Sequence, residues 1–385
     1  MTLPGRRIAL VHDYLTQFGG AEQVLAVLQR LFPEATTFTT LHDPAADLPG
    51  IDQSRVVESR LGAVRWFRQH HRAALPLFPM AMRDLRRRLV DYDVIIADSS
   101  AWAHQLKPRP DQAFIVYCHS PARFLYGDAD YLGATGVEGP VARAFHSVSA
   151  PFRWLDRRAY RRADVVLANS QQVAGRLAHR LGIDATVLHP PIDVSALRPD
   201  GFREPEDWYL VVSRLVPHKR VDLVVETATA HHLPVKIVGV GRELDRLQAR
   251  AGPTVQFLGF QPHAQVIEHF QRCRAFILPG VEDFGMTAVE AQAAGRPVLA
   301  FGRGGALESV QEGVSGVLFA EQTPDSLLAA MRRLDALRVS PEACVQNARL
   351  FDESVFSAGM LEAVERARVI SDQRSGAARP SPSLR

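Results

Sequence analysis

The sequence has few cysteines, little net charge and no long apolar run. Its three cysteines, Cys118, Cys273 and Cys344, are odd in number and far apart, which supports neither a disulfide framework nor a zinc site. No run approaches the ~18 apolar residues of a membrane span, and Ile8–Val11 is too short for the apolar core of a signal peptide. We therefore expect a chain that works in the reducing cytoplasm.

The charge balance excludes a strong global field. The 45 Lys and Arg residues against 42 Asp and Glu residues leave a net charge of +3, so attraction to nucleic acid or anionic lipid must be local. A length of 385 residues with 46% hydrophobic and 23% charged residues is typical of a globular chain with two or three domains. Collagen-like, coiled-coil and wholly disordered chains are excluded.

Short β-branched runs alternate with longer segments of helical period, the pattern of parallel sheets covered by helices on both faces. The strands expected in the first half are Ile8–Val11, Thr36–Thr40, Val94–Ala97, Phe114–Tyr117, Val165–Ala168 and Thr186–Leu188. Those expected in the second half are Tyr209–Val212, Val235–Val238, Val255–Leu258, Phe276–Leu278, Val298–Ala300 and Val317–Phe319. Two similar sets predict an α/β chain with two doubly wound domains, each with its own parallel sheet.

Composition shifts suggest where the domains begin and end. A stretch rich in proline, glycine and acid, residues 190–207, reads as the hinge between a first domain, 1–195, and a second domain, 206–352. We expect residues 353–371 to form a helix that packs back on the first domain. Residues 372–385 contain one large apolar residue, a leucine, and are expected to form a disordered tail.

The strongest motif lies between Phe276 and Phe301. A buried strand is followed by a loop with Glu282, and then Phe284-Gly285-Met286-Thr287 opens a helix that carries Glu290 on its second turn. The unpaired amides at such a helix start can hold an anion, and glycine permits its close approach. Carboxylates accept hydrogen bonds from vicinal hydroxyls, so this pattern indicates a ligand made of sugar, phosphate and sugar.

A second cluster follows the strand that begins the second half. Arg214 and Lys219 lie at the carboxyl end of that strand, where open α/β sheets bind ligands. A guanidinium and an ammonium there can neutralise a diphosphate in place of Mg²⁺. The alternative is that Arg214 pairs with a structural acid and that Lys219 is merely solvated.

The spacing from Glu282 to Glu290 resembles the Glu-x7-Glu signature of the family 4 retaining glycosyltransferases. The resemblance extends to about residue 370 and includes Gly19-Gly20 and the pair Arg214 and Lys219. It implies the GT-B fold, in which two Rossmann-like domains face a cleft. The C-terminal domain would hold a nucleotide-sugar donor and the N-terminal domain the acceptor, with no metal and no other cofactor.

The resemblance also assigns roles to residues. Arg214 and Lys219 would hold the donor's phosphates, Glu290 the ribose hydroxyls and Glu282 the transferred sugar. The donor-binding set is then Gly19, Gly20, Arg214, Lys219, Glu282, Phe284, Gly285, Met286, Thr287 and Glu290. The catalytic set is His119, Arg214, Lys219 and Glu282, and no general base is assigned.

Two features of the first half complete the predicted site. Gly19-Gly20 opens a helix after the first strand, so its amides can approach the donor diphosphate, although two glycines also fit a plain turn. His119 follows a buried strand and can donate a hydrogen bond to a sugar hydroxyl while neutral, or be a structural histidine. The run Cys118-His119-Ser120-Pro121, with Arg123 and Tyr126, resembles the branch of polysaccharide and lipid-linked oligosaccharide mannosyltransferases.

Residues 60–89 form a basic, aromatic insert that includes Trp66 and the run Arg86-Arg87-Arg88. Rings that enter the headgroup zone and guanidinium groups on lipid phosphates would place this insert on a membrane surface. The other interpretation is a solvated face over an ordinary core helix. The first interpretation predicts a peripheral protein at the inner face of the cytoplasmic membrane.

These observations predict a metal-independent retaining hexosyltransferase. The donor would be GDP-mannose first and a UDP-sugar second, and the acceptor a glycan or a polyprenyl-diphosphate-linked sugar, with no nucleic-acid partner. One alternative is a nucleotide-sugar 2-epimerase on the same scaffold, which would convert the donor without an acceptor. Another is a non-catalytic protein that binds the nucleotide sugar and turns nothing over.

Overall fold

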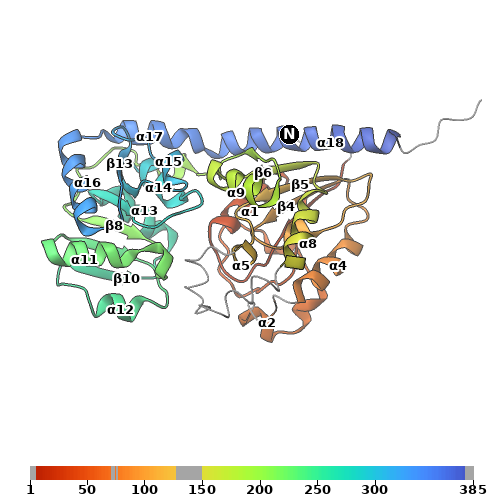
Figure 1. The fold of residues 1–385 in the computed structure, drawn as a ribbon, viewed down its shortest axis with the longest axis horizontal. Helices are drawn as coiled ribbons and strands as arrows, with labels where there is room; N and C mark the ends of the chain where they lie inside the picture. The colour runs from red at the N-terminus through yellow and green to blue at the C-terminus, as the bar shows by residue number, and fades with distance from the viewer. Residues whose placement is uncertain (1–5, 71–73, 75–76, 127–149, 378–385) are drawn as a thin grey trace, which may run out of the picture. The chain divides into compact units, whose positions relative to one another are not determined.

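The computed structural model describes residues 6–70, 74, 77–126 and 150–377. The chain divides into two compact units (Figure 1). The first unit contains the described residues up to Pro191 and those from Phe356 onward, and the second contains Ile192–Val355. Each unit has its own parallel sheet and its own core, and each is described below by itself.

The first unit is built on a seven-stranded parallel sheet with the order β3-β2-β1-β4-β5-β6-β7. Its strands are β1 (Ile8–His12), β2 (Thr36–Thr39), β3 (Val56–Glu58), β4 (Val94–Ser99), β5 (Ala113–Cys118), β6 (Val165–Ala168) and β7 (Thr186–Val187). The central strands β1, β4 and β5 are buried along their whole length, as expected for near-continuous apolar runs covered on both faces. The six strands expected in the first half are confirmed, and β3 is an additional edge strand.

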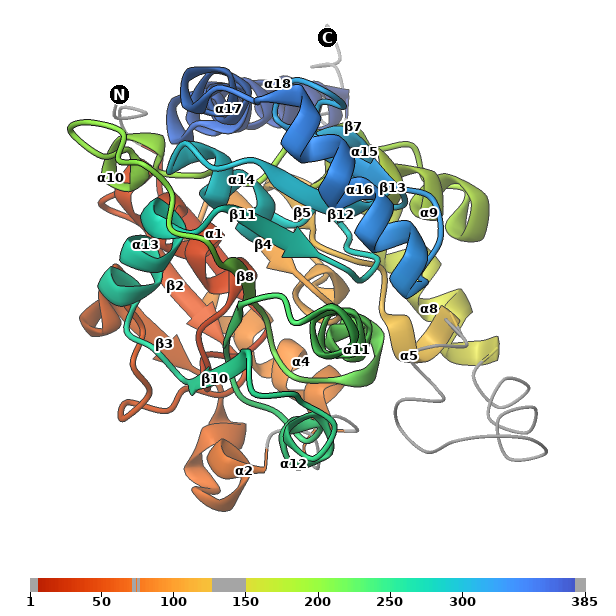
Figure 2. The same ribbon diagram turned by 90° about the vertical axis from the view of Figure 1, so that its left-hand side faces the viewer.

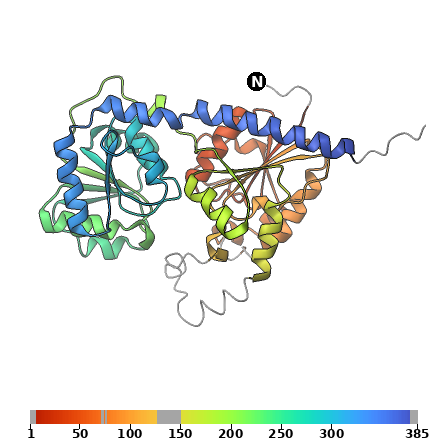
Figure 3. The same ribbon diagram turned by 45° about the horizontal axis from the view of Figure 1, so that its top comes forward.

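Helices cover both faces of this sheet. They are α1 (Gly20–Leu31), α2 (Trp66–Gln69), α4 (Phe78–Arg88), α5 (Arg123–Tyr126), α8 (Ala150–Tyr160), α9 (Gln171–Leu181) and α18 (Glu353–Ala377), with short 3-10 turns η1 (Gln53–Arg55), η2 (Arg60–Ala63) and η4 (Ala103–Gln105). One apolar layer contains α1 and the apolar side of α18, seen in blue in Figure 3, and the other contains α4 and α9. A ligand must therefore reach this sheet from a strand end, because both faces are closed.

The C-terminal helix α18 is longer than the sequence pattern indicates. Phe356, Met360 and Val364 join the core of the first unit, and the helix continues to Ala377. The prediction of a disordered tail from residue 372 is wrong for residues 372–377, because Arg374 pairs with Asp164 and holds that polar end. Residues 378–385 lie outside the described chain.

The second unit is built on a six-stranded parallel sheet with the order β10-β9-β8-β11-β12-β13 (Figure 2). Its strands are β8 (Tyr209–Val212), β9 (Val235–Val238), β10 (Val255–Gly259), β11 (Ala275–Leu278), β12 (Val298–Phe301) and β13 (Gly316–Phe319). Its helices are α10 (Val194–Leu197), α11 (Val221–His231), α12 (Leu244–Gln248), α13 (His263–Arg272), α14 (Met286–Ala293), α15 (Ala306–Ser309), α16 (Pro324–Leu337) and α17 (Pro341–Ala348), with η5 (Pro217–Lys219) and η6 (Arg349–Phe351). All six expected strands are present.

The stretch expected as a hinge packs in large part with the second unit. Helix α10 contributes Val194 and Leu197 to an apolar cluster that also contains Phe202 and residues of α14 and α17. The boundary between the units falls between Pro191 and Ile192, so the second unit begins before residue 206. Proline and acidic residues in this stretch thus mark an irregular surface segment.

Each sheet has one point at which the strand order reverses. In the first unit the reversal lies between β1 and β4, and in the second between β8 and β11. The loops that leave the carboxyl ends of two such strands go to opposite faces of the sheet, which opens a crevice between them. Ligands of open α/β sheets bind at this place, so functional residues are expected directly after β1, β4, β8 and β11.

Candidate active site

Close backbone packing shapes the carboxyl edge of the second sheet. A Cβ at Gly239 would lie 1.9 Å from the carbonyl oxygen of Ser213, and one at Gly241 would lie 2.2 Å from that of Leu215. Only glycine permits this approach, so the loop after β9 presses on the loop after β8. The segment that carries Arg214 is therefore held by backbone contacts.

Lys219 and Glu282 meet at the reversal point of this sheet. The Lys219 Nζ atom lies 2.5 Å from Oε1 and 2.6 Å from Oε2 of Glu282. Lys219 ends the turn η5, and a Cβ at Gly280 would lie 2.9 Å from its Cα, so the two loops are in contact. The amide of Gly305 donates to the carbonyl of Glu282 at 2.9 Å, and Gly304 forms a bridge with the same residue. The pair is thus fixed from three loops.

This ion pair leaves a positive charge available beside it. The side chains of Lys219 and Glu282 are 17% and 16% exposed, and their charges cancel. Arg214 is exposed, and its guanidinium makes neither a hydrogen bond nor an ion pair among the described residues, whereas its carbonyl accepts from Ser213 and Val216. The ammonium of Lys219 has three donors and can share them between Glu282 and an incoming anion. The edge can therefore accept an anionic group at Arg214 and Lys219.

Helix α14 points its amino end toward the same edge. Gly285 precedes it with φ +90° and ψ 57°, and no side chain caps the first turn. Gly285 has no side chain that could cap this helix start, and the amides of Gly285, Met286 and Thr287 lie where helix starts bind anions. Glu290 lies on the second turn and is 8% exposed.

Phe284 does not fit the ligand-binding role expected from the sequence. Its side chain is 2% exposed and packs in an apolar cluster with Val289 and Ala293. Its ring meets that of Phe351 edge to face, with centroids 5.2 Å apart. We assign the Phe284 side chain to the core, and only its backbone remains near the site.

In the first unit the double glycine opens α1. Gly19 is the N-cap residue in an extended conformation, Gly20 is the first helical residue, and no side chain caps this helix either. Glu22 lies in the first turn and is 5% exposed, and a Cβ at Gly19 would lie 3.3 Å from its Oε2 atom. Glycine at position 19 therefore lets the Glu22 carboxylate lie against the helix start.

Four charged or titratable side chains form a chain at the reversal point of the first sheet. His12 ends β1, and its Nδ1 lies 2.8 Å from Oδ2 of Asp98, which belongs to β4. The other oxygen of Asp98 lies 2.5 Å from Nε2 of His119, directly after β5. The Nε2 atom of His12 lies 3.5 Å from Glu22. A continuous polar chain thus connects Glu22, His12, Asp98 and His119.

The charge state of this chain follows from its contacts. Burial disfavours a charged imidazole, but hydrogen bonds to Asp98 and Glu22 outweigh burial and raise the pKa of His12 to about 10. Burial would raise the pKa of Asp98, but interactions with His119 and His12 hold it below the usual value of a carboxyl. At neutral pH His12 is therefore an imidazolium and Asp98 a carboxylate.

This geometry bears on which nitrogen of His119 can face a ligand. An ionised carboxylate only accepts hydrogen bonds, so the Nε2 atom of His119 must carry the proton that faces Asp98. A neutral imidazole has one N–H, so its Nδ1 atom is then an acceptor. In that tautomer a neutral His119 would accept a hydrogen bond from a hydroxyl through Nδ1. The expected donor role of His119 toward a sugar hydroxyl stays a prediction.

Asp13, directly after β1, fixes the loop that follows β4. One carboxylate oxygen accepts from the amides of Ser100 and Ala101 at 2.9 and 2.7 Å, and the other from those of Trp102 and Ala103 at 3.0 and 2.6 Å. Four successive amides around one carboxylate form a closed anion nest. The carboxyl ends of β1 and β4 are thereby joined.

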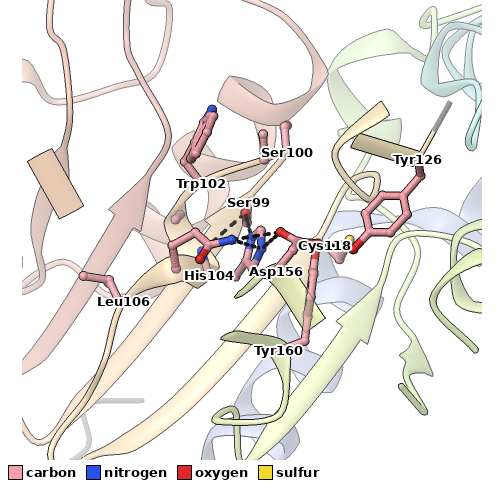
Figure 4. Close-up of polar contacts among 12 residues, drawn as sticks. Ser99, Ser100, Trp102, His104, Leu106, Cys118, Tyr126, Asp156 and Tyr160 are labelled. Carbon is pink, nitrogen blue, oxygen red and sulfur yellow. Dashed lines mark hydrogen bonds and ion pairs between the residues drawn. The ribbon is translucent and has the colours of Figure 1, made fainter. Parts of the chain in front are cut away.

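A second buried histidine, His104, belongs to a separate polar cluster with Ser99 and Asp156 (Figure 4). The hydroxyl of Ser99 lies 2.8 Å from Nδ1 of His104, whose Nε2 lies 2.7 Å from Asp156. The hydroxyl of Tyr126 donates to the other oxygen of Asp156 at 2.7 Å. Serine, histidine and aspartate are the residue types of a hydrolase triad, but all three are 0% exposed. This cluster is structural and ties α8 and α5 to β4.

The sequence patterns did not single out His12, Glu22, Asp98 or Asp13. The signal was present, because His12 and Asp98 lie in the two strands on either side of the reversal point and Asp13 follows β1 at once. In the sequence, His12 and Asp98 merely stand at the ends of apolar runs. Strand order, which decides the place of the crevice, cannot be read from those runs.

Neither a metal cluster nor a membrane span is found in the described part of the chain. Within those residues, no group of three or more His, Cys, Asp and Glu side chains is arranged to hold a metal ion. None of the described helices is both long and apolar enough to cross a bilayer. The prediction of metal independence remains a prediction.

Family models match both halves of the chain. The model described as Glycosyltransferase Family 4 matches residues 18–196, and the one described as Glycosyl transferases group 1 matches residues 196–351. Together they match residues 18–351, which include the second reversal point and the site residues described above except His12 and Asp13.

Curated relatives include D-inositol 3-phosphate glycosyltransferases. The protein from Geodermatophilus obscurus is 32% identical over 209 residues, which are 46% of this chain and 46% of the relative. The protein from Streptomyces bingchenggensis is 26% identical over 316 residues, which are 69% of this chain and 67% of the relative. The chain thus spans about half the length of the first of these relatives.

Solved structures share the fold at low sequence identity. HepE of Anabaena in complex with UDP has a TM-score of 0.69 at 16% identity, and the match covers 93% of this chain and 99% of HepE. Sucrose-phosphate synthase of Thermosynechococcus elongatus has a TM-score of 0.71 at 17% identity, with 97% and 100% covered. The two Rossmann-like units and the two matched family models show that the chain belongs to the family 4 glycosyltransferases of GT-B fold.

Proposed function

We propose that this protein transfers a hexose from a nucleoside diphosphate sugar, bound by the second unit, to a glycan or lipid-linked acceptor. The observation that carries the proposal is the ion pair of Lys219 and Glu282 beside exposed Arg214 and the uncapped start of α14. This arrangement supplies cations and amides for a diphosphate and a carboxylate for a sugar within one crevice.

The chemistry follows from which charges develop. When the bond to the sugar breaks, negative charge grows on the departing diphosphate, and Arg214 and Lys219 stabilise it. Glu282 orients the sugar, and buried Glu290 accepts from the ribose hydroxyls. In the retaining, metal-independent mechanism that we propose, the β-phosphate takes the proton of the acceptor hydroxyl on the same face of the sugar. Arg214 and Lys219 then replace a divalent cation.

The donor base and sugar are proposed on separate grounds. The Cys118-His119-Ser120-Pro121 run favours GDP-mannose, as expected from the mannosyltransferase resemblance. Three structures of HepE are described as complexes of that protein with UDP, with UDP and glucose, or with UDP-glucose. These neighbours support a UDP-hexose as the competing donor, so both sugars belong in the first assay.

The acceptor proposal rests on the basic, aromatic face of the first unit. Trp66 and Met80 are 54% and 71% exposed and offer apolar surface to a partner. Arg83, Arg86 and Arg87 line a surface pocket of about 300 Å³. Apolar side chains beside clustered guanidinium groups suit an anionic membrane surface. We propose peripheral membrane contact and a polyprenyl-diphosphate-linked sugar as acceptor.

The test is a thermal-shift panel followed by turnover. GDP, UDP, ADP, GDP-mannose and UDP-glucose are each added to the protein, and the correct base should raise the melting temperature most. Lys219→Ala should lose most of this shift, whereas Lys107→Ala, which changes a lysine of the first unit, should keep it. A panel without any shift, or an equal shift in Lys219→Ala, would overturn the proposed donor site.

Turnover separates the proposed function from its alternatives. Labelled donor is incubated alone and with glycan or polyprenyl-diphosphate-linked acceptors. A transferase releases nucleoside diphosphate only in step with a glycosylated product. A 2-epimerase would convert the donor with no acceptor present, and a binding protein would shift in melting temperature and convert nothing.

A further inference from the structure

We propose that Asp98 and His12 are positioning residues, which fix the His119 ring in one tautomer and connect that ring to the start of α1. The inference rests on the proposed function in one respect, the placement of His119 at the ligand site. It is carried by the polar chain from Glu22 through His12 and Asp98 to His119.

Burial decides which end of this chain can meet a ligand. The side chains of His12, Glu22 and Asp98 are 3%, 7% and 0% exposed, and that of His119 is 11% exposed. His119 is therefore the end of the chain with the most solvent contact. The other three members act on a ligand only through the His119 ring and through the helix start beside Glu22.

Asp98 sets the tautomer of that ring. Its Oδ1 atom accepts from Nε2 of His119, so the neutral ring carries its proton on Nε2 and presents Nδ1 as an acceptor. The Tyr117 ring packs edge to face on His119, with centroids 5.1 Å apart, and limits rotation of the imidazole. A ligand hydroxyl would donate to Nδ1, and an acceptor group in the same place would be rejected.

His12 acts on His119 through Asp98, which contacts both rings. A carboxyl group as buried as Asp98 stays ionised only if a cation compensates for its lost hydration, and the His12 imidazolium is that cation. Without His12, Asp98 would take up a proton and could donate it to Nε2 of His119. The ring would then carry its own proton on Nδ1. Loss of His12 is thus expected to invert the tautomer of His119.

The same imidazolium holds Glu22, which lies in the first turn of α1 against Gly19. One cation therefore fixes two predicted ligand-contacting features, the His119 ring and the Gly19-Gly20 helix start. Glu22 and Asp98 would otherwise be two buried carboxylates without a shared counter-charge. This explains why an ion pair that is costly to bury lies at the reversal point of the sheet.

The structure contains a matched control for these contacts. Asp156 and His104 also form a buried carboxylate–imidazole pair, with Nε2 2.7 Å from the carboxylate. Both side chains are 0% exposed, so this pair reaches no ligand. Changes at Asp156 test loss of buried carboxylate contacts that reach no ligand, and changes at Asp98 test loss of such contacts plus loss of His119 orientation.

The first experiment measures the His119 ring nitrogens in the ligand-free protein by long-range ¹H–¹⁵N correlation, with His119→Gln as the assignment control. We expect a protonated Nε2 and an unprotonated Nδ1 near pH 7, and a mixture or the opposite tautomer in His12→Gln. A Nδ1-protonated ring in the unchanged protein, or the same spectrum in His12→Gln, would overturn the inference. This readout requires no turnover.

The second experiment is a double-mutant cycle on kcat/KM. Asp98→Asn should lower kcat/KM about 10- to 100-fold, the range for loss of a hydrogen-bond partner that orients a ligand-contacting side chain. In a His119→Ala background the same change should cost less than about 3-fold, because Asp98 acts through His119. Asp156→Asn should lower the melting temperature and leave kcat/KM of the folded enzyme within about 3-fold.

The outcomes separate the inference from the proposed function. Equal effects of Asp98→Asn in both backgrounds would overturn the positioning role even in an active enzyme. If Asp98→Asn does not fold, the pair Asp98→Asn with His12→Asn removes both buried charges and replaces it in the cycle. If the unchanged protein transfers no sugar, the proposed function fails, and the ring-nitrogen spectra still decide the inference.

Discussion

Arg214 and Lys219 lie in one short segment but differ in what they already contact. Both oxygens of Glu282 lie within 2.6 Å of the Lys219 ammonium, whereas Arg214 is exposed and unpaired among the described residues. A diphosphate would gain the whole planar fork of Arg214 without the loss of another contact. Lys219 must divide its donors between the carboxylate and the phosphate. Arg214 should therefore contribute the larger share of new charge stabilisation.

Arg214→Ala should lower kcat by ~10²–10³, the scale for loss of one preorganised group that stabilises developing charge. Arg332→Ala removes an exposed arginine from α16 in the same unit and should leave kcat unchanged. Steady-state kinetics on the donor identified by thermal shift provides the measurement. Near-parental turnover in Arg214→Ala would remove this residue from the site.

His12 gives the first unit a stability that depends on pH. Hydrogen bonds to Asp98 and Glu22, against the effect of burial, raise the pKa of His12 from 6.5 to about 10 in the folded chain. The folded state therefore binds this proton more tightly than the unfolded state. The resulting stability is fully present below pH 6.5, declines as the pH rises and is lost above about pH 10.

The free energy of unfolding should consequently fall between pH 6.5 and 10, by up to about 1.4 kcal/mol per pH unit for one proton. His12→Gln should flatten this dependence, and His179→Gln, an exposed histidine on α9, should keep it. Denaturant titrations across this pH range provide the measurement. A His12→Gln protein with the same slope as the unchanged protein would contradict the assignment.

At the scale of the element, α14 depends on the backbone of one residue. Gly285 adopts φ +90°, a region that disfavours residues with a Cβ, and a Cβ there would lie 3.1 Å from Cδ2 of Leu278. This conformation turns the chain so that the first amides of α14 face the loop with Glu282. A change at Gly285 therefore alters the angle at which the helix start meets an anion.

Gly285→Ala should lower the free energy of unfolding of the second unit by about 1–2 kcal/mol and weaken nucleoside diphosphate binding at least about 10-fold. Gly313→Ala is the matched control. Gly313 has φ +74°, a Cβ there would meet no atom within 4 Å, and it precedes β13 at the opposite edge of the sheet. The Gly313→Ala protein should lose a similar free energy of unfolding. Its affinity for the nucleoside diphosphate, measured by calorimetry, should be unchanged. Equal affinity losses in both variants would assign the effect to general destabilisation.

Most strands could be predicted because they are buried on both faces and therefore apolar along their length. Edge strand β3 was missed because Val56–Glu58 is short and only half buried, so the sequence carries little strand signal. The start and end of α14 were also predictable from Gly285 and Gly295. The polar contacts that connect His12 to His119 could not be predicted, because they depend on the parallel pairing of β1, β4 and β5, which are distant in the sequence.

At the scale of the whole molecule, a net charge of +3 conceals a local concentration of arginine. Arg60 and Arg88 pair with Asp84, and Arg68 pairs with Glu58, so part of the basic insert is neutralised. The remaining cations of α4, Arg83, Arg86 and Arg87, gather around one pocket with Lys107. Burial and the neighbouring charges of Arg158 and Arg86 lower the pKa of Arg162, so this face contains excess positive charge.

An anionic membrane would compensate the excess positive charge of this face. In a flotation assay the protein should therefore float with vesicles that contain phosphatidylserine and should remain in the bottom fraction with vesicles of phosphatidylcholine alone. Each basic side chain near such a surface contributes about 1 kcal/mol, so the triple change of Arg83, Arg86 and Arg87 to alanine should lower partitioning roughly 100-fold. Changing Arg250, Arg332 and Arg349 of the second unit removes the same charge and should have little effect. Binding by the unchanged protein should also fall with added salt. Equal losses in the two triple variants would attribute binding to overall charge, and flotation with neutral vesicles would contradict recognition of anionic lipid by this face.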